Sequence, residues 1–108
     1  MTRAEFCQSF SQRECTNVAP ACLLTEGDCL AVRQAACAAW AQGEESLQRA
    51  FDPANADECL SRVSAVFGLV KQNLAIDARN FRSIDTACER VFHGSAQAND
   101  ICGVDADC

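Results

Sequence analysis

Two segments of equal length, CQSFSQREC at residues 7–15 and CLAVRQAAC at residues 29–37, decide the fold. Each begins and ends with a cysteine, and eight positions are a little over two α-helical turns, so both thiols project from nearly one face. If the chain folds back between the segments, an antiparallel helix pair brings Cys7 opposite Cys37. Cys15 and Cys29 then form a second rung about 12 Å away. Because such rungs allow the close Cα approach of a disulfide, the spacing predicts a doubly cross-linked helical hairpin.

Capping and helix-breaking residues predict the ends of these two helices. The sequence Thr2-Arg3-Ala4-Glu5 fits a capping box, so the first helix should begin there. Pro20, which has no amide donor, is expected to end it. The second helix is expected over residues 28–42, with Gly43 just beyond its last turn.

The remainder of the chain predicts two more helices. Residues 44–51 are expected to be an extended connector, and Asp52-Pro53 is a typical helix start. A third helix should follow, with an apolar stripe formed by Ala56, Cys59, Leu60, Val63, Phe67 and Val70. Residues 74–81 either extend this helix or form a loop with a helical turn. A short fourth helix, capped by Asp85, should include Ala87, Cys88, Val91 and Phe92 and be closed by Gly94.

These elements predict an all-α fold, a small disulfide-stapled bundle of about four helices with an irregular C-terminal tail. Residues 1–94 are expected to form the disulfide-rich helical domain. Residues 95–108 are expected to be an irregular, acidic, cysteine-containing tail and the start of a truncated segment of a longer protein.

The five cysteines outside the twin segments suggest two further bridges. Cys59 and Cys88, on the third and fourth helices, are the natural third pair. Cys22 lies in the turn between the first two helices and is expected to bond to Cys102. Cys108 is then unpaired or intermolecular, with a dimer through it as one option. Because eight cysteines allow on the order of a hundred pairings, this scheme depends on the helical register.

Composition favours an exported protein and excludes several functional classes. Nine of the 108 residues are cysteines and 49% are apolar, a pattern typical of a disulfide scaffold at an extracellular or cell-surface location. The chain has no apolar run of about 18 residues, so no membrane span is expected. A net charge of −6 argues against a nucleic-acid partner. No two cysteines lie as close as zinc ligands or a Cys-x-x-Cys redox motif require, so no metal or other cofactor is expected.

Two family resemblances follow from the cysteine pattern. The twin segments are similar to those of coiled-coil-helix-coiled-coil-helix proteins of the mitochondrial intermembrane space, which have a longer spacing than the seven intervening residues here. Residues 88–94, Ile101-Cys102 and residues 105–108 resemble a cysteine-rich helical domain of predicted secreted proteins and lipoproteins of myxobacteria and their relatives. Residues 51–53, Ala56 and Cys59-Leu60 fit the same pattern. This second resemblance implies an exported protein whose cysteines continue beyond Cys108, and it implies no particular activity.

Candidate site residues have structural interpretations that we prefer. His93 is expected to stabilise the C-terminal end of the fourth helix as a cation, rather than to act in a catalytic dyad. The tail residues Asn99, Asp100, Asp105 and Asp107 offer calcium-type oxygens without EF-hand spacing, and we favour a solvated turn.

The charged and aromatic residues also have structural interpretations. Of the carboxylate pairs, Glu44-Glu45 is expected in a loop and Asp57-Glu58 in a first helical turn. The basic residues Lys71, Arg79, Arg82 and Arg90 either bind an anionic partner or form a solvated face, which we favour in an acidic chain. Most of the aromatic residues are expected in the core: Phe6, Phe10, Trp40, Phe51, Phe67, Phe81 and Phe92.

The sequence is compatible with two functions. The preferred one is a non-enzymatic extracellular structural or interaction module of a larger secreted or surface-anchored protein, kept rigid by disulfides and bound to another surface or secreted protein. The alternative is a small carrier of an apolar ligand or lipid, with a cavity lined by Trp40, Val63, Val66, Phe67 and Val70. An enzyme is not expected, because the sequence has no dyad, close cysteine pair or phosphate loop.

Overall fold

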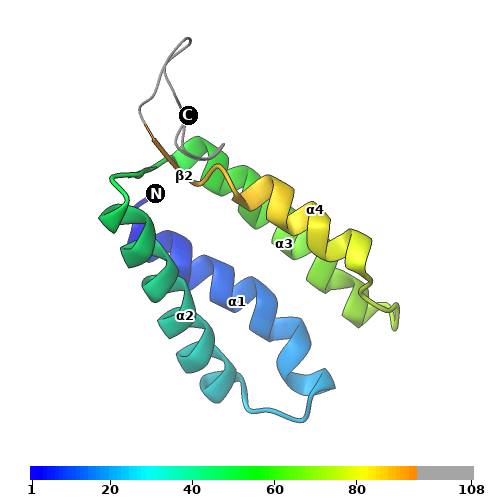
Figure 1. Ribbon diagram of the computed structural model, residues 1–108. Coiled ribbons are helices and arrows are strands. Elements are labelled where there is room, and N and C mark those ends of the chain that lie inside the picture. The colour runs from blue at the N-terminus through cyan, green and yellow to red at the C-terminus, as the bar shows by residue number, and fades with distance from the viewer. Residues whose placement is uncertain (95–108) are drawn as a thin grey trace.

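The computed structural model describes residues 1–94, and over this range it consists of four helices and one short antiparallel sheet (Figure 1). In chain order the elements are α1 (Arg3–Ala21), α2 (Glu26–Ser46), β1 (Ala50–Phe51), α3 (Pro53–Lys71), α4 (Ala78–Cys88) and β2 (Phe92–His93). The predicted small all-α, disulfide-stapled fold is therefore confirmed.

The four helices form two hairpins, α1–α2 and α3–α4, that pack side by side. Helix α1 packs against both α2 and α3, and α4 packs against α3, so α1 and α3 are the inner helices (Figure 1). The sheet closes one end of the assembly, because Ala50 pairs with His93 and Phe51 with Phe92. It ties the connector between the hairpins to the segment that follows α4.

Three disulfides cross-link the helices within these hairpins. Cys7–Cys37 and Cys15–Cys29 join α1 to α2 with Cα–Cα distances of 5.6 and 5.8 Å, the two rungs expected from the cysteine register. The third bridge joins Cys59 of α3 to Cys88 of α4, with a Cα–Cα distance of 4.6 Å. Since every bridge joins two different helices, the cross-links fix how the helices lie against one another.

The main core lies between the two hairpins and is centred on aromatic rings. Phe6 is fully buried, and its ring centroid lies 5.8–6.0 Å from those of Phe10, Trp40 and Phe51. Trp40 also meets Phe92 edge-on at 5.0 Å, so rings from α1, α2, β1 and β2 form one cluster. The aliphatic part comes largely from α3, with Leu60, Val63 and Val66. Of the aromatic residues expected in the core, Phe6, Phe67 and Phe92 are buried and Phe10, Trp40 and Phe51 are partly buried against it, whereas Phe81 is 48% exposed.

Helix α2 is longer than the predicted range of 28–42 and passes through the glycine expected to end it. Thr25 is the N-cap, and its side chain accepts a hydrogen bond from the Asp28 amide. Gly43 lies within the helix, which continues to Ser46, so only part of residues 44–51 is extended. A helical glycine costs only about 1 kcal/mol relative to alanine, and burial of Cys37 and Ala41 offsets that cost. Helix α1 likewise ends one residue after Pro20 rather than at it.

The prediction for the fourth helix was wrong at both ends. Helix α4 begins after Asp77, whose side chain forms a reciprocal capping box with Asn80, and Asp85 lies inside the helix. Two aspartates suited to capping compete in this region, and the reciprocal partner exists only for Asp77. The helix ends at Cys88 because the next residues turn into β2, where Phe92 reaches the aromatic cluster.

Cys22 is an exposed free thiol, in contrast to the bridge expected with Cys102. It caps the end of α1 in the turn between α1 and α2 (Figure 1). Cys102, Cys108 and the rest of the predicted tail lie outside the described residues.

Candidate functional site

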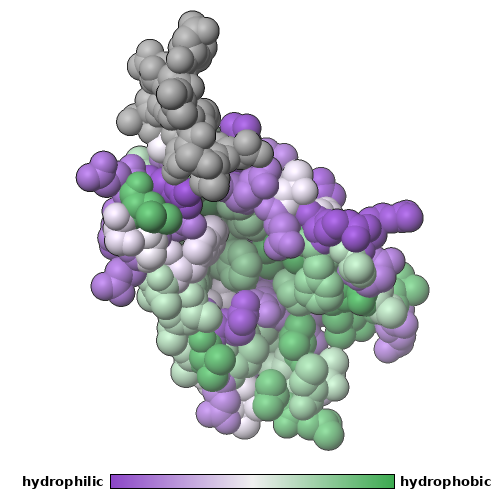
Figure 2. Space-filling view, in the orientation of Figure 1, coloured by the Kyte–Doolittle hydropathy of each residue, from purple (hydrophilic) through white to green (hydrophobic). Residues whose placement is uncertain are grey.

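A polar groove lies between α3 and α4. Its volume is about 650 Å³. Hydrophilic side chains gather over α4, on the upper right of the face in Figure 2. The groove is lined by Asn55, Glu58, Arg62, Arg79, Arg82, Ser83, Thr86, Ala87, Glu89 and Arg90. We call this set the arginine groove.

Helical spacing explains why these side chains share one groove. On α3, Asn55, Glu58 and Arg62 are separated by three and four positions and therefore follow one face of the helix. On α4, Arg79, Ser83 and Thr86 follow one another at the same intervals. Because the Cys59–Cys88 bridge and apolar packing hold the two helices together, the two polar stripes face a common space.

The four arginines of the groove form no ion pair among the described residues. The other arginines of the fold are engaged: Arg3 with Glu45, Arg33 with Glu14, Arg49 with Glu44, and Arg13 with the hydroxyls of Ser9 and Ser64. Like charges three or four positions apart destabilise a helix by a few tenths of a kcal/mol.

The groove reverses the charge of the molecule locally. The whole chain has a net charge of −6. The groove lining contains four arginines and two glutamates, which gives 4 − 2 = +2. A positive region lined by hydrogen-bond donors attracts and orients anions.

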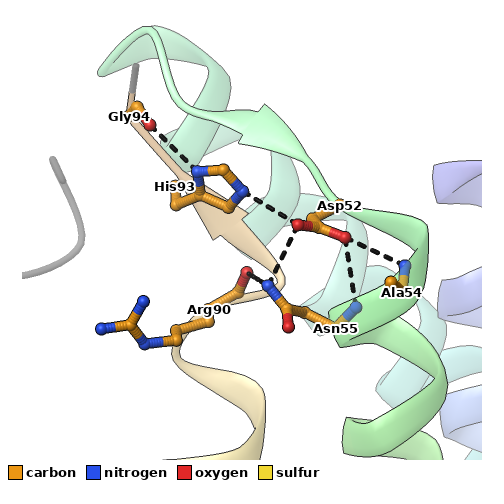
Figure 3. Close-up of polar contacts among 6 residues, drawn as sticks. All are labelled: Asp52, Ala54, Asn55, Arg90, His93 and Gly94. Atoms are coloured by element: carbon orange, nitrogen blue, oxygen red, sulfur yellow. Dashed lines mark hydrogen bonds and ion pairs between the residues drawn. The ribbon is translucent and has the colours of Figure 1, made fainter. Parts of the chain in front are cut away.

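A hydrogen-bonded cluster fixes one end of the groove (Figure 3). Asp52 caps α3 by accepting from the amides of Ala54 and Asn55 at 2.9 and 3.2 Å. The side-chain amide of Asn55 donates to Asp52 Oδ2 and to the Arg90 carbonyl, both at 3.1 Å. The start of α3 thereby holds the backbone of Arg90, whose side chain lines the groove.

His93 completes this cluster and uses both of its ring nitrogens. Nδ1 lies 2.9 Å from the Gly94 carbonyl and Nε2 lies 3.0 Å from Asp52 Oδ2. Both partners are oxygen acceptors, so both contacts are satisfied only when each ring nitrogen carries a proton. The bond to Gly94, and then that to Asp52, raise the pKa of His93, and the bond from His93 lowers the pKa of Asp52. His93 lies in β2, so the expected role at a helix C-terminus was wrong.

In this arrangement His93 is not placed to act as a general base. A general base needs a free ring nitrogen within reach of a substrate proton, and neither nitrogen of His93 is free. Among residues 1–94 no group of three or more histidine, cysteine, aspartate or glutamate side chains is placed to hold a metal ion. The expected calcium-type residues of the tail, Asn99, Asp100, Asp105 and Asp107, lie outside the described range.

The structure brings together three of the four basic residues grouped from the sequence. Arg79, Arg82 and Arg90 line the groove, whereas Lys71 is exposed outside its lining. Arg62 of α3 was missed, although its position four residues after Glu58 on a polar stripe was a usable signal.

The two carboxylate pairs occupy positions different from those expected. Glu44 lies in the last turn of α2 and binds both Arg49 and Trp40 Nε1, and neighbouring Glu45 pairs with Arg3. Asp57 and Glu58 lie beyond the first turn of α3, which contains no acidic residue. Glu44 and Glu45 are helical because α2 extends past Gly43, and Asp57 and Glu58 fall in the second turn because the first turn of α3 is residues 53–56.

The residues expected to line a carrier cavity pack within or against the core instead. Val63, Val66 and Phe67 are at most 8% exposed and belong to the main core, against which Trp40 packs. None of the three grooves described for residues 1–94 is lined by them or by Val70. Within the same range, the structure has no helix with the length and hydropathy needed to span a membrane.

Comparison with known proteins returns no relative from which a function can be transferred. Neither a protein-family model, nor a curated protein, nor a solved structure matches this chain. The function is therefore inferred from the stapled fold and the arginine groove.

Proposed function

We propose that this chain is a non-enzymatic interaction module of a larger secreted or surface-anchored protein, and that it binds an acidic partner through the arginine groove. The observation that carries the proposal is the set of three disulfides, each of which joins two helices. Structural disulfides form and persist in oxidising compartments outside the cytosol. Their presence supports an extracellular or cell-surface location.

Rigidity is the mechanism of the proposed module. The Cys59–Cys88 bridge holds α3 and α4, the two helices that carry the groove, at a fixed separation. Preorganised side chains lose less conformational entropy when they bind, so more of the contact energy appears as affinity. The Asp52–Asn55–His93 cluster adds a second anchor at the end of the groove.

The absence of catalysis is part of the same proposal. The titratable pair Asp52–His93 is used to connect β2 to α3, with both ring nitrogens engaged. We further propose that the chain shares its architecture with the cysteine-rich helical domains of myxobacterial secreted proteins, on the residues that carry that resemblance.

Retention on a carboxylated surface at neutral pH and low ionic strength tests the proposal. A chain with a net charge of −6 is repelled by such a surface unless a local positive site binds it. We expect the oxidised protein to be retained, the Arg79→Gln/Arg82→Gln variant to elute freely, and Arg3→Gln/Lys71→Gln to behave as wild type. Both variants lower the net charge by two, so only the position of the charges differs.

Reduction provides the second arm of this experiment. After full reduction and alkylation, we expect loss of helical circular dichroism and of retention. If the oxidised protein is not retained on the carboxylated surface, binding through the groove is contradicted. A helical fold and retention that both survive reduction would contradict the argument for an oxidising compartment.

A further inference from the structure

We propose that the arginine groove binds a short acidic saccharide, whose carboxylates pair with the arginines and whose hydroxyls donate to Glu58 and Glu89. This inference rests on the proposed function and names the chemistry of the partner. It replaces the protein partner expected from the sequence with a glycan partner.

The mixed lining of the groove favours a ligand with both charges and hydroxyl groups. Arginine presents a planar fork of donors that matches a carboxylate in two parallel hydrogen bonds. Glu58 and Glu89 are acceptors only, and they repel a bare anion or a polyphosphate. Sugar hydroxyls donate to such carboxylates and also pair with Ser83 and Thr86. A sugar acid therefore uses every polar class in the lining.

The same lining disfavours docking of an acidic peptide or protein. Protein interfaces are anchored at their centre by aromatic residues and by arginines held in well-packed, desolvated pockets. The arginine groove contains no aromatic residue, and Ala87 is its only apolar one. Of the aromatic residues on these elements, Phe92 belongs to the ring cluster and Phe67 to the core, and the half-exposed Phe81 lies outside the lining, with its ring near that of Phe67.

The size of the groove fits a ligand of a few sugar units. Sites for small ligands have volumes of roughly 300–1,000 Å³, and this groove measures about 650 Å³. Positive charge lies on both walls, since Arg62 belongs to α3 and Arg79 and Arg82 belong to α4. An oligomer with a carboxylate on each unit is therefore contacted from both sides.

Calorimetric titration of the oxidised protein with a galacturonate trimer tests this inference. The comparison ligands are the neutral galactose trimer, a glutamate trimer and inorganic phosphate. We expect the galacturonate trimer to bind most tightly and the neutral trimer not to bind. Arg79→Gln/Arg82→Gln should weaken binding by about tenfold or more, because two charge-assisted contacts are lost, while Arg3→Gln/Lys71→Gln should not.

A glutamate variant separates the saccharide from a bare anion. Glu58→Ala should weaken binding of the galacturonate trimer severalfold, because a hydroxyl loses its acceptor, and should strengthen any binding of phosphate, because a repulsive charge is removed. Asp57→Ala, the adjacent residue outside the groove lining, removes the same charge and should change neither. Equal or tighter binding of the glutamate trimer or of phosphate would overturn the inference, as would tighter saccharide binding by Glu58→Ala. If the protein is retained on the carboxylated surface but binds no galacturonate trimer, the proposed function stands and this inference fails.

Discussion

Nε2 of His93 lies 3.0 Å from Oδ2 of Asp52, across 41 positions of sequence, and joins strand β2 to the N-cap of α3. The contact connects the end of the described chain to the start of the helix that carries one wall of the arginine groove. It also makes the stability of this junction dependent on pH.

We predict that His93→Gln destabilises the protein most between about pH 4 and pH 6.5. The pKa of His93 is raised from 6.5, first by the Gly94 carbonyl and then by Asp52, so its contribution is full below pH 6.5 and is lost as pH rises through the raised pKa. The pKa of Asp52 is lowered from 3.8, mainly by His93, so its contribution is present above pH 3.8 and is lost as pH falls through the lowered pKa. Chemical denaturation of both proteins across pH, followed by Trp40 fluorescence, measures the difference. A difference that does not change with pH would contradict this assignment.

Removal of individual bridges should separate global stability from the groove. Cys59→Ala/Cys88→Ala opens a cross-link spanning 29 positions, and we expect a loss of about 3–4 kcal/mol together with loss of retention on the carboxylated surface. Cys15→Ala/Cys29→Ala spans 14 positions in the other hairpin and should cost about 3 kcal/mol while retention persists. Denaturation and retention are measured under conditions where each variant remains folded. Equal effects of the two variants on retention would show that the α3–α4 bridge has no special role.

The ring cluster should dominate the packing energy between the hairpins. Phe6 is 0% exposed and touches rings from α1, α2 and β1. Phe6→Ala should lower the free energy of unfolding by about 3–5 kcal/mol, because a large cavity remains in the core. Phe81→Ala is the matched control, since Phe81 is 48% exposed, and should cost about 1 kcal/mol or less. Guanidinium denaturation distinguishes these values, and similar losses for both variants would refute the central position of Phe6.

The turn after α1 offers a stabilising substitution. Leu23 has a φ of 57°, a left-handed conformation that costs a side-chain-bearing residue about 1 kcal/mol, and its side chain is 94% exposed. Leu23→Gly should therefore raise the free energy of unfolding by about 0.5–1 kcal/mol, since little packing is lost. Leu24→Gly, at a neighbouring exposed residue without a positive φ, should not stabilise. Thermal unfolding of both variants tests this, and a lower melting temperature for Leu23→Gly would contradict it.

Much of the helical hairpin was predictable because helix geometry converts cysteine spacing into register. Cys7, Cys15, Cys29 and Cys37 lie on two equal intervals, and a fixed rise per residue leaves one antiparallel match. The start of α3 was equally clear, because Asp52 is a typical N-cap residue and Pro53 suits the first helical turn. The start of α3 depends on local interactions, and the register of the hairpin depends on the repeated interval between cysteines.

The remaining features depended on tertiary contacts that the local pattern does not contain. Gly43 stays helical because its neighbours pack and pair, and Asp77 displaces Asp85 as a cap because Asn80 completes the box. The arginine groove could be predicted only from the alignment of α3 and α4, which places Arg62 in the same groove as the arginines of α4. The solvated face favoured from the sequence agrees with the exposure of Arg79, Arg82 and Arg90, and only the fold shows that they share a groove with Arg62.

The most direct test of the stapled fold is peptide mapping of the disulfides in the unreduced protein, after alkylation of free thiols in the folded state. Trypsin separates the bridge partners of two pairs, and we predict that residues 4–13 remain linked to 34–49 through Cys7–Cys37, and 50–62 to 83–90 through Cys59–Cys88. Residues 14–33 should contain an internal Cys15–Cys29 bond and an alkylated Cys22. A link between residues 4–13 and 14–33, or a Cys22 that resists alkylation, would contradict the arrangement of helices described above.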